Sequence, residues 1–173
     1  ARGMWRMAGR NALITRLSAV ETLGATSMIL TDKTGTLTEN RMALSVILLH
    51  ESDVEVSGAH EPGKSTFSNA AGDLDDNSNA IIDELLMTSA LCSNAALDRD
   101  GKGTGVGDPT ELALLMAASG RDIWRADLSE RAPELREDPF DPGCKRMATL
   151  HQWQDGYLVA VKGAPEAILP RRR

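Results

Sequence analysis

Residues 134–166 have the sequence ELREDPFDPGCKRMATLHQWQDGYLVAVKGAPE. This stretch predicts three strands, around residues 135–140, 146–153 and 157–162. The last two strands are separated by Asp155-Gly156, a pair of residues that strongly favours a tight hairpin turn. Strands joined by such a turn run antiparallel, so the stretch predicts an antiparallel sheet.

Two helices are predicted before this sheet. One begins near Ser78 or Asn79, where apolar residues recur at helical spacing. The other is capped by Asp108, has Pro109 at its first position and ends near Gly120. Hairpin strands beside a pair of helices predict an α+β domain, in which helices flank an antiparallel sheet.

The chain before residue 80 predicts less regular structure. Met28-Ile29-Leu30 is a short apolar run that suits a buried parallel strand with a loop at its carboxyl end. Residues 41–49 predict a second strand. The chain from 50 to 79 is polar and rich in glycine, serine and acidic residues, and we interpret it as a surface loop with a short strand at 54–56.

Composition excludes some classes of protein. The net charge of −6 argues against nucleic-acid binding, which needs a basic face, so a polyphosphate ligand needs a local cluster of lysines and arginines. Cys92 and Cys144 lie far apart in sequence and are interpreted as reduced thiols. The three histidines make no metal-ligand pattern, and no apolar run reaches the ~18–20 residues that cross a bilayer.

The strongest chemical motif is Asp32-Lys33-Thr34-Gly35-Thr36-Leu37-Thr38. An aspartate at the end of an apolar strand lies at the edge where α/β sheets bind ligands, and its carboxylate can attack a phosphoryl group. Gly35 lets the backbone approach a phosphate closely, while Lys33 and the threonine hydroxyls can donate hydrogen bonds to phosphoryl oxygens. On spacing alone, an ordinary turn with an aspartate and several threonines fits this string equally well.

With Glu39-Asn40 after it, this string resembles the phosphorylation signature of P-type ATPases. The resemblance implies that Asp32 is the phosphorylated residue, that Lys33 and Thr34 belong to the catalytic loop, and that Mg²⁺ is held partly by Asp32 and the Thr34 carbonyl. Phosphatases of the same superfamily usually carry a second aspartate two residues after the nucleophile, where this chain has Thr34. Without that general acid, an acyl-phosphate on Asp32 persists, as a transport cycle requires.

Lys162-Gly163-Ala164-Pro165-Glu166 places a lysine at the end of a strand, before a helix that begins with proline. The lysine and the helix N-terminus together suit an anion, although a solvated lysine at a strand end fits the same string. The segment resembles the KGAPE signature of the P-type ATPase nucleotide-binding domain. That resemblance implies that Lys162 and Gly163 line an ATP pocket.

Pro139-Phe140-Asp141, followed by Lys145-Arg146-Met147, forms a third motif. An exposed phenylalanine offers a face to an adenine ring, with stacking worth ~1–3 kcal/mol per base, and the basic pair supplies positive charge. A core phenylalanine beside a surface basic pair explains the same residues. The spacing resembles the F…KRM segment of the same domain, whose phenylalanine stacks on adenine, and the resemblance implies that Lys145, Arg146 and Met147 bind the nucleotide as well. Pro142 stands where that segment often has an arginine.

Glu111 ends the segment Gly107-Asp108-Pro109-Thr110-Glu111. It occupies the third helical position after the Asp108 cap, so helix capping alone explains a glutamate there. The segment also resembles the G-[DE]-x-T-E pattern of the same nucleotide-binding domain, and the resemblance implies that Glu111 approaches the adenine amino group.

Two further patterns suggest other ligands. Residues 58–65 fit the P-loop pattern G-x-x-x-x-G-K-[ST], with Lys64 as the phosphate lysine. A P-loop needs a following helix, whereas the segment that follows here is short, polar and ended by a glycine. Residues 98–101 hint at a calcium loop, but Lys102 and Pro109 occupy positions where an EF-hand has ligands.

Four segments in the family's order, from Asp32 to Glu166, resemble the cytosolic ATP-binding part of a cation-transporting P-type ATPase, most similar to bacterial calcium-type pumps. The resemblance implies that residues 1–40 are the stalk and the start of an α/β phosphorylation domain, and that residues 41–173 are the nucleotide-binding domain. It implies ATP and Mg²⁺ as cofactors. The partners it implies are the remaining phosphorylation, actuator and membrane domains of the same pump, in a bacterial plasma membrane.

The family's later Mg²⁺-binding segment, GDGxND, does not occur in this sequence. We therefore expect the chain alone to bind ATP without turning it over. A soluble phosphatase-like hydrolase of the same superfamily, a P-loop ATPase and a non-catalytic interaction module are the alternative interpretations. The interaction module predicts that the chain binds no nucleotide.

Overall fold

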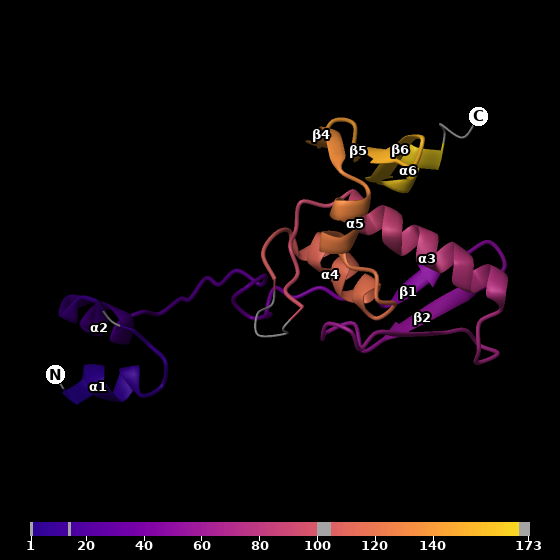
Figure 1. Ribbon diagram of the computed structural model, residues 1–173. Coiled ribbons are helices and arrows are strands. Elements are labelled where there is room, and N and C mark those ends of the chain that lie inside the picture. Colours follow the sequence, from indigo (N-terminus) through magenta and orange to yellow (C-terminus); the bar gives the residue numbers. More distant parts are fainter. Residues whose placement is uncertain (1, 14, 100–104, 170–173) are drawn as a thin grey trace. The chain divides into compact units, whose positions relative to one another are not determined.

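The computed structural model describes residues 2–13, 15–99 and 105–169, and the chain divides into two compact units, Ala1–Asn40 and Arg41–Arg173. Figure 1 labels the elements of both units. The assignment of these units to a phosphorylation domain and a nucleotide-binding domain stays a prediction. Among the described residues, no helix is both long and apolar enough to cross a bilayer.

The first unit contains two short helices, α1 (Arg2–Ala8) and α2 (Leu17–Gly24). The strand predicted at Met28-Ile29-Leu30 is wrong, because this run has no regular structure and the Leu30 side chain is 90% exposed. A parallel strand needs a neighbouring strand for its backbone hydrogen bonds, and the described part of this unit contains no strand to pair with it.

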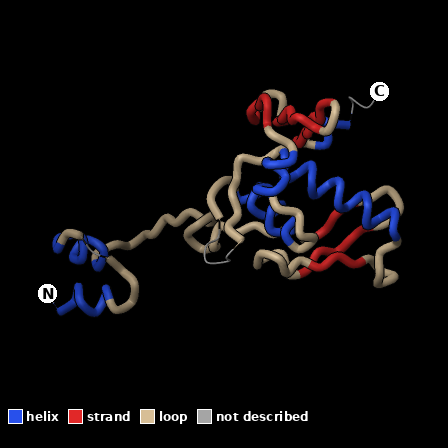
Figure 2. Tube along the Cα trace, viewed as in Figure 1, coloured by secondary structure: helices blue, strands red, loops and turns tan. Residues whose placement is uncertain are grey.

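The second unit has a layer of helices between two antiparallel three-stranded sheets, which Figure 2 shows as two red groups on opposite sides of the blue helices. This confirms the α+β class, with two small sheets. The first sheet contains β1 (Val46–Leu48), β2 (Asp53–Ser57) and β3 (Thr66–Ser68). The helical layer contains α3 (Asp76–Leu91), α4 (Pro109–Ser119) and α5 (Arg125–Arg131). The second sheet contains β4 (Glu134–Asp141), β5 (Arg146–Trp153) and β6 (Gly156–Gly163), and α6 (Pro165–Ile168) follows it.

Aspartate caps fix the starts of the two longer helices. The Asp108 carboxylate accepts hydrogen bonds from the Thr110 and Glu111 amides, as the sequence predicted for α4. The predicted start of α3 was late, because Asp75 is the cap and accepts a hydrogen bond from the Ser78 amide at 2.7 Å. The helix therefore begins at Asp76.

Two apolar clusters form the core of the second unit. One packs α3, α4 and α5 against the β4–β6 sheet and includes Leu91, Leu115 and Met147. The other packs α3 and α4 against β2 and includes Val54 and Ile82. The Ile123 side chain, between α4 and α5, packs against both clusters, so the two sheets share one helical layer.

The β4–β6 sheet matches the predicted strands closely. The hairpin turn is displaced by one residue, since Gly156 pairs with Trp153 and the turn is formed by Gln154 and Asp155. The β4 register shifts between Asp138 and Asp141, so the intervening residues form a bulge beside β5. This irregularity lies where the candidate site is built.

Two other parts of the unit differ from the sequence prediction. The short strand predicted at 54–56 is confirmed as the centre of β2, but the predicted loop 50–79 also contains β3 and the start of α3, and the predicted strand 41–49 is limited to Val46–Leu48. The polar stretch after α4 contains α5, which the sequence did not predict. The glycine-rich stretch proposed and rejected as a calcium loop lies partly outside the described residues, since 100–104 are not described.

Candidate functional site

The second unit has a cavity of about 620 Å³ between the start of α4 and the β4–β6 sheet. Its lining comes from three places: the first turns of α4, the end of β4 with the turn after it, and the junction of β6 with α6. The lining residues are Asp108, Thr110, Glu111, Leu114, Phe140, Lys145, Lys162, Gly163 and Ala164. The cavity therefore brings together five predicted site residues from segments that lie far apart in sequence.

Glu111 is held firmly on the α4 wall. Its Oε2 atom accepts hydrogen bonds from the Asn94 and Ala95 amides, each at 2.9 Å, and its Oε1 atom accepts one from Lys162 Nζ. Burial alone would raise the pKa of this carboxyl. The Lys162 ammonium and the two amides outweigh burial and hold the pKa of Glu111 below its ordinary value, so the carboxylate is charged at neutral pH.

Glu111 and Lys162 form an ion pair inside the cavity, with side chains only 12% and 25% exposed. Their head groups place a strong acceptor beside a strong donor. Much of the Lys162 charge is balanced by Glu111, so this lysine is less available to a second anion than an unpaired one.

Phe140 and Lys145 belong to the opposite, more open wall. The Phe140 side chain is 59% exposed, which is unusual for so large an apolar group, and it leaves a ring face available at the cavity. Lys145 Nζ donates to Glu166 Oε1 at 2.8 Å, and this hydrogen bond holds the pKa of Glu166 below its ordinary value. Both partners of this pair are mostly exposed, so Lys145 can exchange Glu166 for another anion at small cost.

Gly163 allows β6 to approach the β4–β5 turn. A Cβ atom at this position would lie 2.5 Å from the Lys145 carbonyl oxygen and 2.7 Å from Arg146 Cβ. The Ala164 amide also donates to that Lys145 oxygen at 3.0 Å. The glycine in this motif therefore fixes the position of Lys145, a role that its place in the sequence alone does not reveal.

A family model described as P-type ATPase, cytoplasmic domain N, matches residues 81–172, the region that forms this cavity. The chain belongs to the P-type ATPase family. It is 40% identical over 98% of its length to the "Cation-transporting ATPase pma1" of Synechocystis sp., and 39% over 96% to the "Probable cation-transporting ATPase F" of Mycobacterium tuberculosis. It is 34% identical over 98% of its length to the "Calcium-transporting ATPase" of Bacillus subtilis. The chain spans 19% of the length of each of these relatives.

Not every predicted pocket residue of this P-type ATPase chain lines the cavity. Arg146 and Met147 follow Lys145 but are absent from the lining, and the Met147 side chain is 2% exposed within the core. Conversely, the cavity includes four residues that were not predicted as site residues: Asp108, Thr110, Leu114 and Ala164. Leu114 lies three residues after Glu111 on α4, so helical spacing from Glu111 could have identified it, whereas this spacing does not relate Thr110 to Glu111.

The P-type ATPase signature around Asp32 forms a compact turn in the first unit. The Leu37 and Thr38 amides donate to the Lys33 carbonyl at 3.0 and 3.2 Å, and Gly35 adopts a φ of 75°. Asp32 Oδ1 accepts a hydrogen bond from the Lys33 amide at 2.7 Å, and the Asp32 side chain is exposed. The catalytic roles of Asp32, Lys33 and Thr34 stay predictions.

The P-loop pattern at 58–65 lacks the frame of a P-loop. The segment joins β2 to β3, so a strand follows it where a P-loop requires a helix. The Gly63 amide donates to Ser119 Oγ at 2.8 Å, and the Ser65 hydroxyl donates to the Met116 carbonyl at 3.2 Å. One amide that a P-loop would direct at phosphate, and the hydroxyl that it would direct at Mg²⁺, are therefore engaged with the end of α4.

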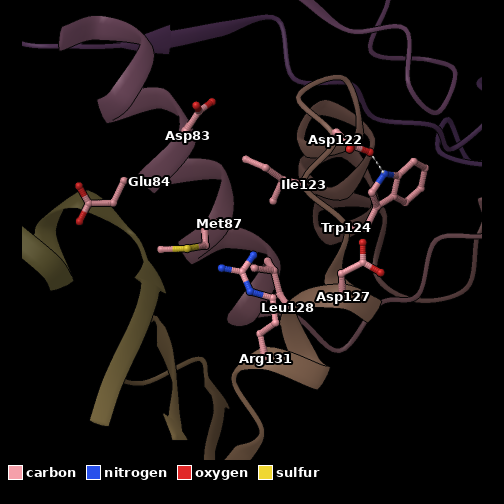
Figure 3. A pocket seen from close by; sticks show the side chains of 9 residues that line it. All are labelled: Asp83, Glu84, Met87, Asp122, Ile123, Trp124, Asp127, Leu128 and Arg131. Carbon is pink, nitrogen blue, oxygen red and sulfur yellow. Dashed lines mark hydrogen bonds between the residues drawn. The ribbon is translucent and has the colours of Figure 1, made fainter. Parts of the chain in front are cut away.

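A second cavity, of about 390 Å³, lies between α3 and α5. Figure 3 shows its lining residues: Asp83, Glu84, Met87, Asp122, Ile123, Trp124, Asp127, Leu128 and Arg131. Four carboxylates and one guanidinium surround it, so its charge repels a polyphosphate. Asp127 is paired with Arg99, whose guanidinium lies 4.9 Å from the centre of the Trp124 ring. The first cavity is therefore the better candidate for a nucleotide site.

Proposed function

We propose that residues 41–173 bind ATP, as the nucleotide-binding domain of a cation-transporting P-type ATPase. One observation carries the proposal: Phe140, Glu111, Lys145 and Lys162 come from separate elements and line one cavity. The cavity between α3 and α5, and a smaller one beside Arg99 and Trp124, have no lysine in their linings.

The cavity suits each part of ATP. Its volume of about 620 Å³ is within the range of small-molecule sites. The exposed Phe140 ring offers a stacking surface to adenine. Lys145, whose partner Glu166 is exposed, supports the binding of phosphate more directly than Lys162, whose charge is shared with the buried Glu111 carboxylate. The Glu111–Lys162 pair offers an acceptor to the adenine amino group and a donor beside it.

In the parent protein, we propose that Asp32 receives the γ-phosphoryl group of ATP and that this step drives cation transport. The exposed Asp32 carboxylate can reach an incoming phosphate without desolvation of neighbouring groups. Mg²⁺ fits the oxygen atoms of Asp32 and the Thr34 carbonyl in kind, and when bound it would neutralise charge on the transferred phosphate. Mg²⁺ requires near-octahedral coordination, so these two groups would supply only part of its ligands.

The parent protein is proposed to be an integral membrane protein of a bacterial plasma membrane, with this chain on the cytosolic side. Its partners are then the remaining phosphorylation, actuator and membrane domains of the same pump. The names of the bacterial relatives support this placement. A non-catalytic interaction module is the rival, and it predicts that the chain shows no response to ATP.

Titration with ATP tests the proposal, with amide NMR shifts as the readout. We expect shifts at cavity residues and about a tenfold loss of affinity for Phe140→Ala, because stacking on one aromatic ring is worth ~1–3 kcal/mol. Leu135→Ala is the matched control, since Leu135 is an exposed apolar residue on the same strand, 52% exposed, and does not line the cavity. Equal losses for the two variants would contradict stacking on Phe140.

Incubation with γ-labelled ATP and Mg²⁺ tests catalysis by the chain alone. We expect neither ATP hydrolysis nor stable label on Asp32, because phosphoryl transfer depends on positioning and charge stabilisation from several groups around the phosphate. Hydroxylamine-sensitive label that disappears in Asp32→Asn would show that the first unit is competent without further parts of the pump.

A further inference from the structure

The end of α3 and the segment that follows it contact both α4 and the β4–β6 sheet. The Asn94 and Ala95 amides bind the Glu111 carboxylate on the α4 wall. Toward the sheet, the Leu91 carbonyl accepts a hydrogen bond from Thr149 Oγ1 at 3.5 Å, and Cys92 Sγ donates to the Met147 carbonyl at 3.6 Å. The segment therefore joins α4 to the β4–β6 sheet.

Asn94 by itself contacts both α4 and the β4–β6 sheet. Its backbone amide donates to Glu111 Oε2 at 2.9 Å, while its side-chain Nδ2 donates to Glu137 Oε1 at 2.7 Å. Glu137 lies on β4, three residues before Phe140. Both acceptors are carboxylates, and hydrogen bonds to charged acceptors are stronger than those between neutral groups.

The position of Phe140 depends on such a contact because the regular ladder does not hold it. Glu137 and Asp138 pair with Thr149 and Ala148, but the next paired residue of β4 is Asp141. Pro139 has no amide hydrogen to donate, and Phe140 lies with it in the bulge. The ring is therefore fixed from its two flanks, by Glu137 and Asp138 on one side and by Asp141 on the other.

We propose that Asn94 is a positioning residue that sets the distance between the Phe140 ring and the Glu111 carboxylate, and so the affinity of the cavity for a nucleoside triphosphate. The proposal rests on the proposed ATP-binding function. Asn94 does not line the cavity and belongs to neither buried cluster, so its side chain acts on the ligand through Glu137 and β4.

Asn94→Ala is the primary test, because it removes the bond to Glu137 and keeps the backbone bond to Glu111. We expect about a threefold loss of ATP affinity, since the lost hydrogen bond is to a charged but exposed group. Glu137→Ala removes the acceptor of the same hydrogen bond and should give the same loss of ATP affinity. Glu137→Gln keeps an oxygen acceptor for Asn94 Nδ2 and should restore most of the affinity.

A double-mutant cycle with Phe140→Ala separates positioning from a general structural effect. If Asn94 acts by placing the Phe140 ring, Asn94→Ala costs no further affinity in the Phe140→Ala background. A threefold loss that persists in that background would overturn the proposal and leave Asn94 a structural residue. Asn79→Ala is the control, because Asn79 also uses its side-chain amide, toward the Leu74 and Asp75 carbonyls, at the far end of α3.

The outcomes for the two proposals differ. Failure of the unaltered chain to bind ATP would overturn the proposed function and the role of Asn94 together. Normal ATP binding by the unaltered chain, with unchanged affinity in both Asn94→Ala and Glu137→Ala, would overturn the role of Asn94 alone. Thermal unfolding of each variant, followed by circular dichroism, confirms that the titrated protein is folded.

Discussion

The chain contains two glycine–lysine segments that suggest phosphate binding, and they lie in very different structural surroundings. Lys64 follows the better-known pattern, yet it lies in a hairpin connection and is paired with the exposed Glu61, with side chains 67% and 62% exposed. Lys162 lies at the end of β6, inside a cavity and beside the start of α6. A phosphate-binding motif therefore depends on the backbone conformation that holds it. The same residues without a strand–loop–helix arrangement are weak evidence for phosphate binding.

Substitution of the glycine in each segment by alanine is expected to give the largest difference between the two segments in stability and ATP binding. Gly163→Ala places a Cβ atom against the Lys145 carbonyl and should lower the free energy of unfolding by about 1–3 kcal/mol and weaken ATP binding. Gly63→Ala meets no atom within 4 Å but keeps a φ of 74°, so it should cost about 1 kcal/mol of stability and leave ATP affinity unchanged. Urea unfolding and ATP titration of both variants measure this. A loss of ATP binding in Gly63→Ala would restore the P-loop interpretation.

The two lysines give the next largest difference. Lys162→Ala should reduce ATP affinity about fivefold, since it removes a partly buried cation and leaves the Glu111 carboxylate without its counter-charge. Lys64→Ala should leave ATP affinity nearly unchanged, because Lys64 is paired with Glu61 at the surface. Titration of both variants with ATP at one fixed salt concentration shows which lysine contributes more to ATP affinity. A larger loss for Lys64→Ala would assign phosphate binding to Lys64 in place of Lys162.

The smallest difference is in pH dependence. The pKa of Glu111 is held below its ordinary value, so its stabilising contribution is present above that ordinary value and is lost as pH falls through the lowered one. The stability advantage of the wild type over Glu111→Gln should therefore shrink by about 1 kcal/mol as pH falls from 7 to 3. Glu61→Gln should show a much weaker trend, because the Glu61–Lys64 pair is solvated. Denaturant unfolding across this pH range compares them.

The sequence predicted the elements that have strong local signals. The predicted bounds of β5, 146–153, are those of the structure, and Asp108 with Pro109 marked the start of α4 correctly. It missed α5, whose single buried residue is Leu128 and whose cap position, Trp124, makes no side-chain cap hydrogen bond. One buried residue in seven gives no apolar periodicity to detect.

At the site, too, the sequence predicted only the residues that have a local sequence signal. Phe140, Glu111, Lys145 and Lys162 were found through motifs, and the structure places all four at one cavity. Asn94 and Ala95 were not found, because they act on Glu111 through backbone amides that every non-proline residue has. Met147 was expected beside Lys145 at the site, but strand alternation turns it into the core.

The position of Ile123 has a consequence for how the second unit unfolds. Its side chain packs against both buried clusters, so the opening of either cluster removes contacts that also support the other. Amide protection in β2 and in β5 should therefore be lost together, in one cooperative transition. In Ile123→Ala, the two sheets should lose amide protection in separate transitions. The sheet that loses protection first would show which cluster is less stable without the shared side chain.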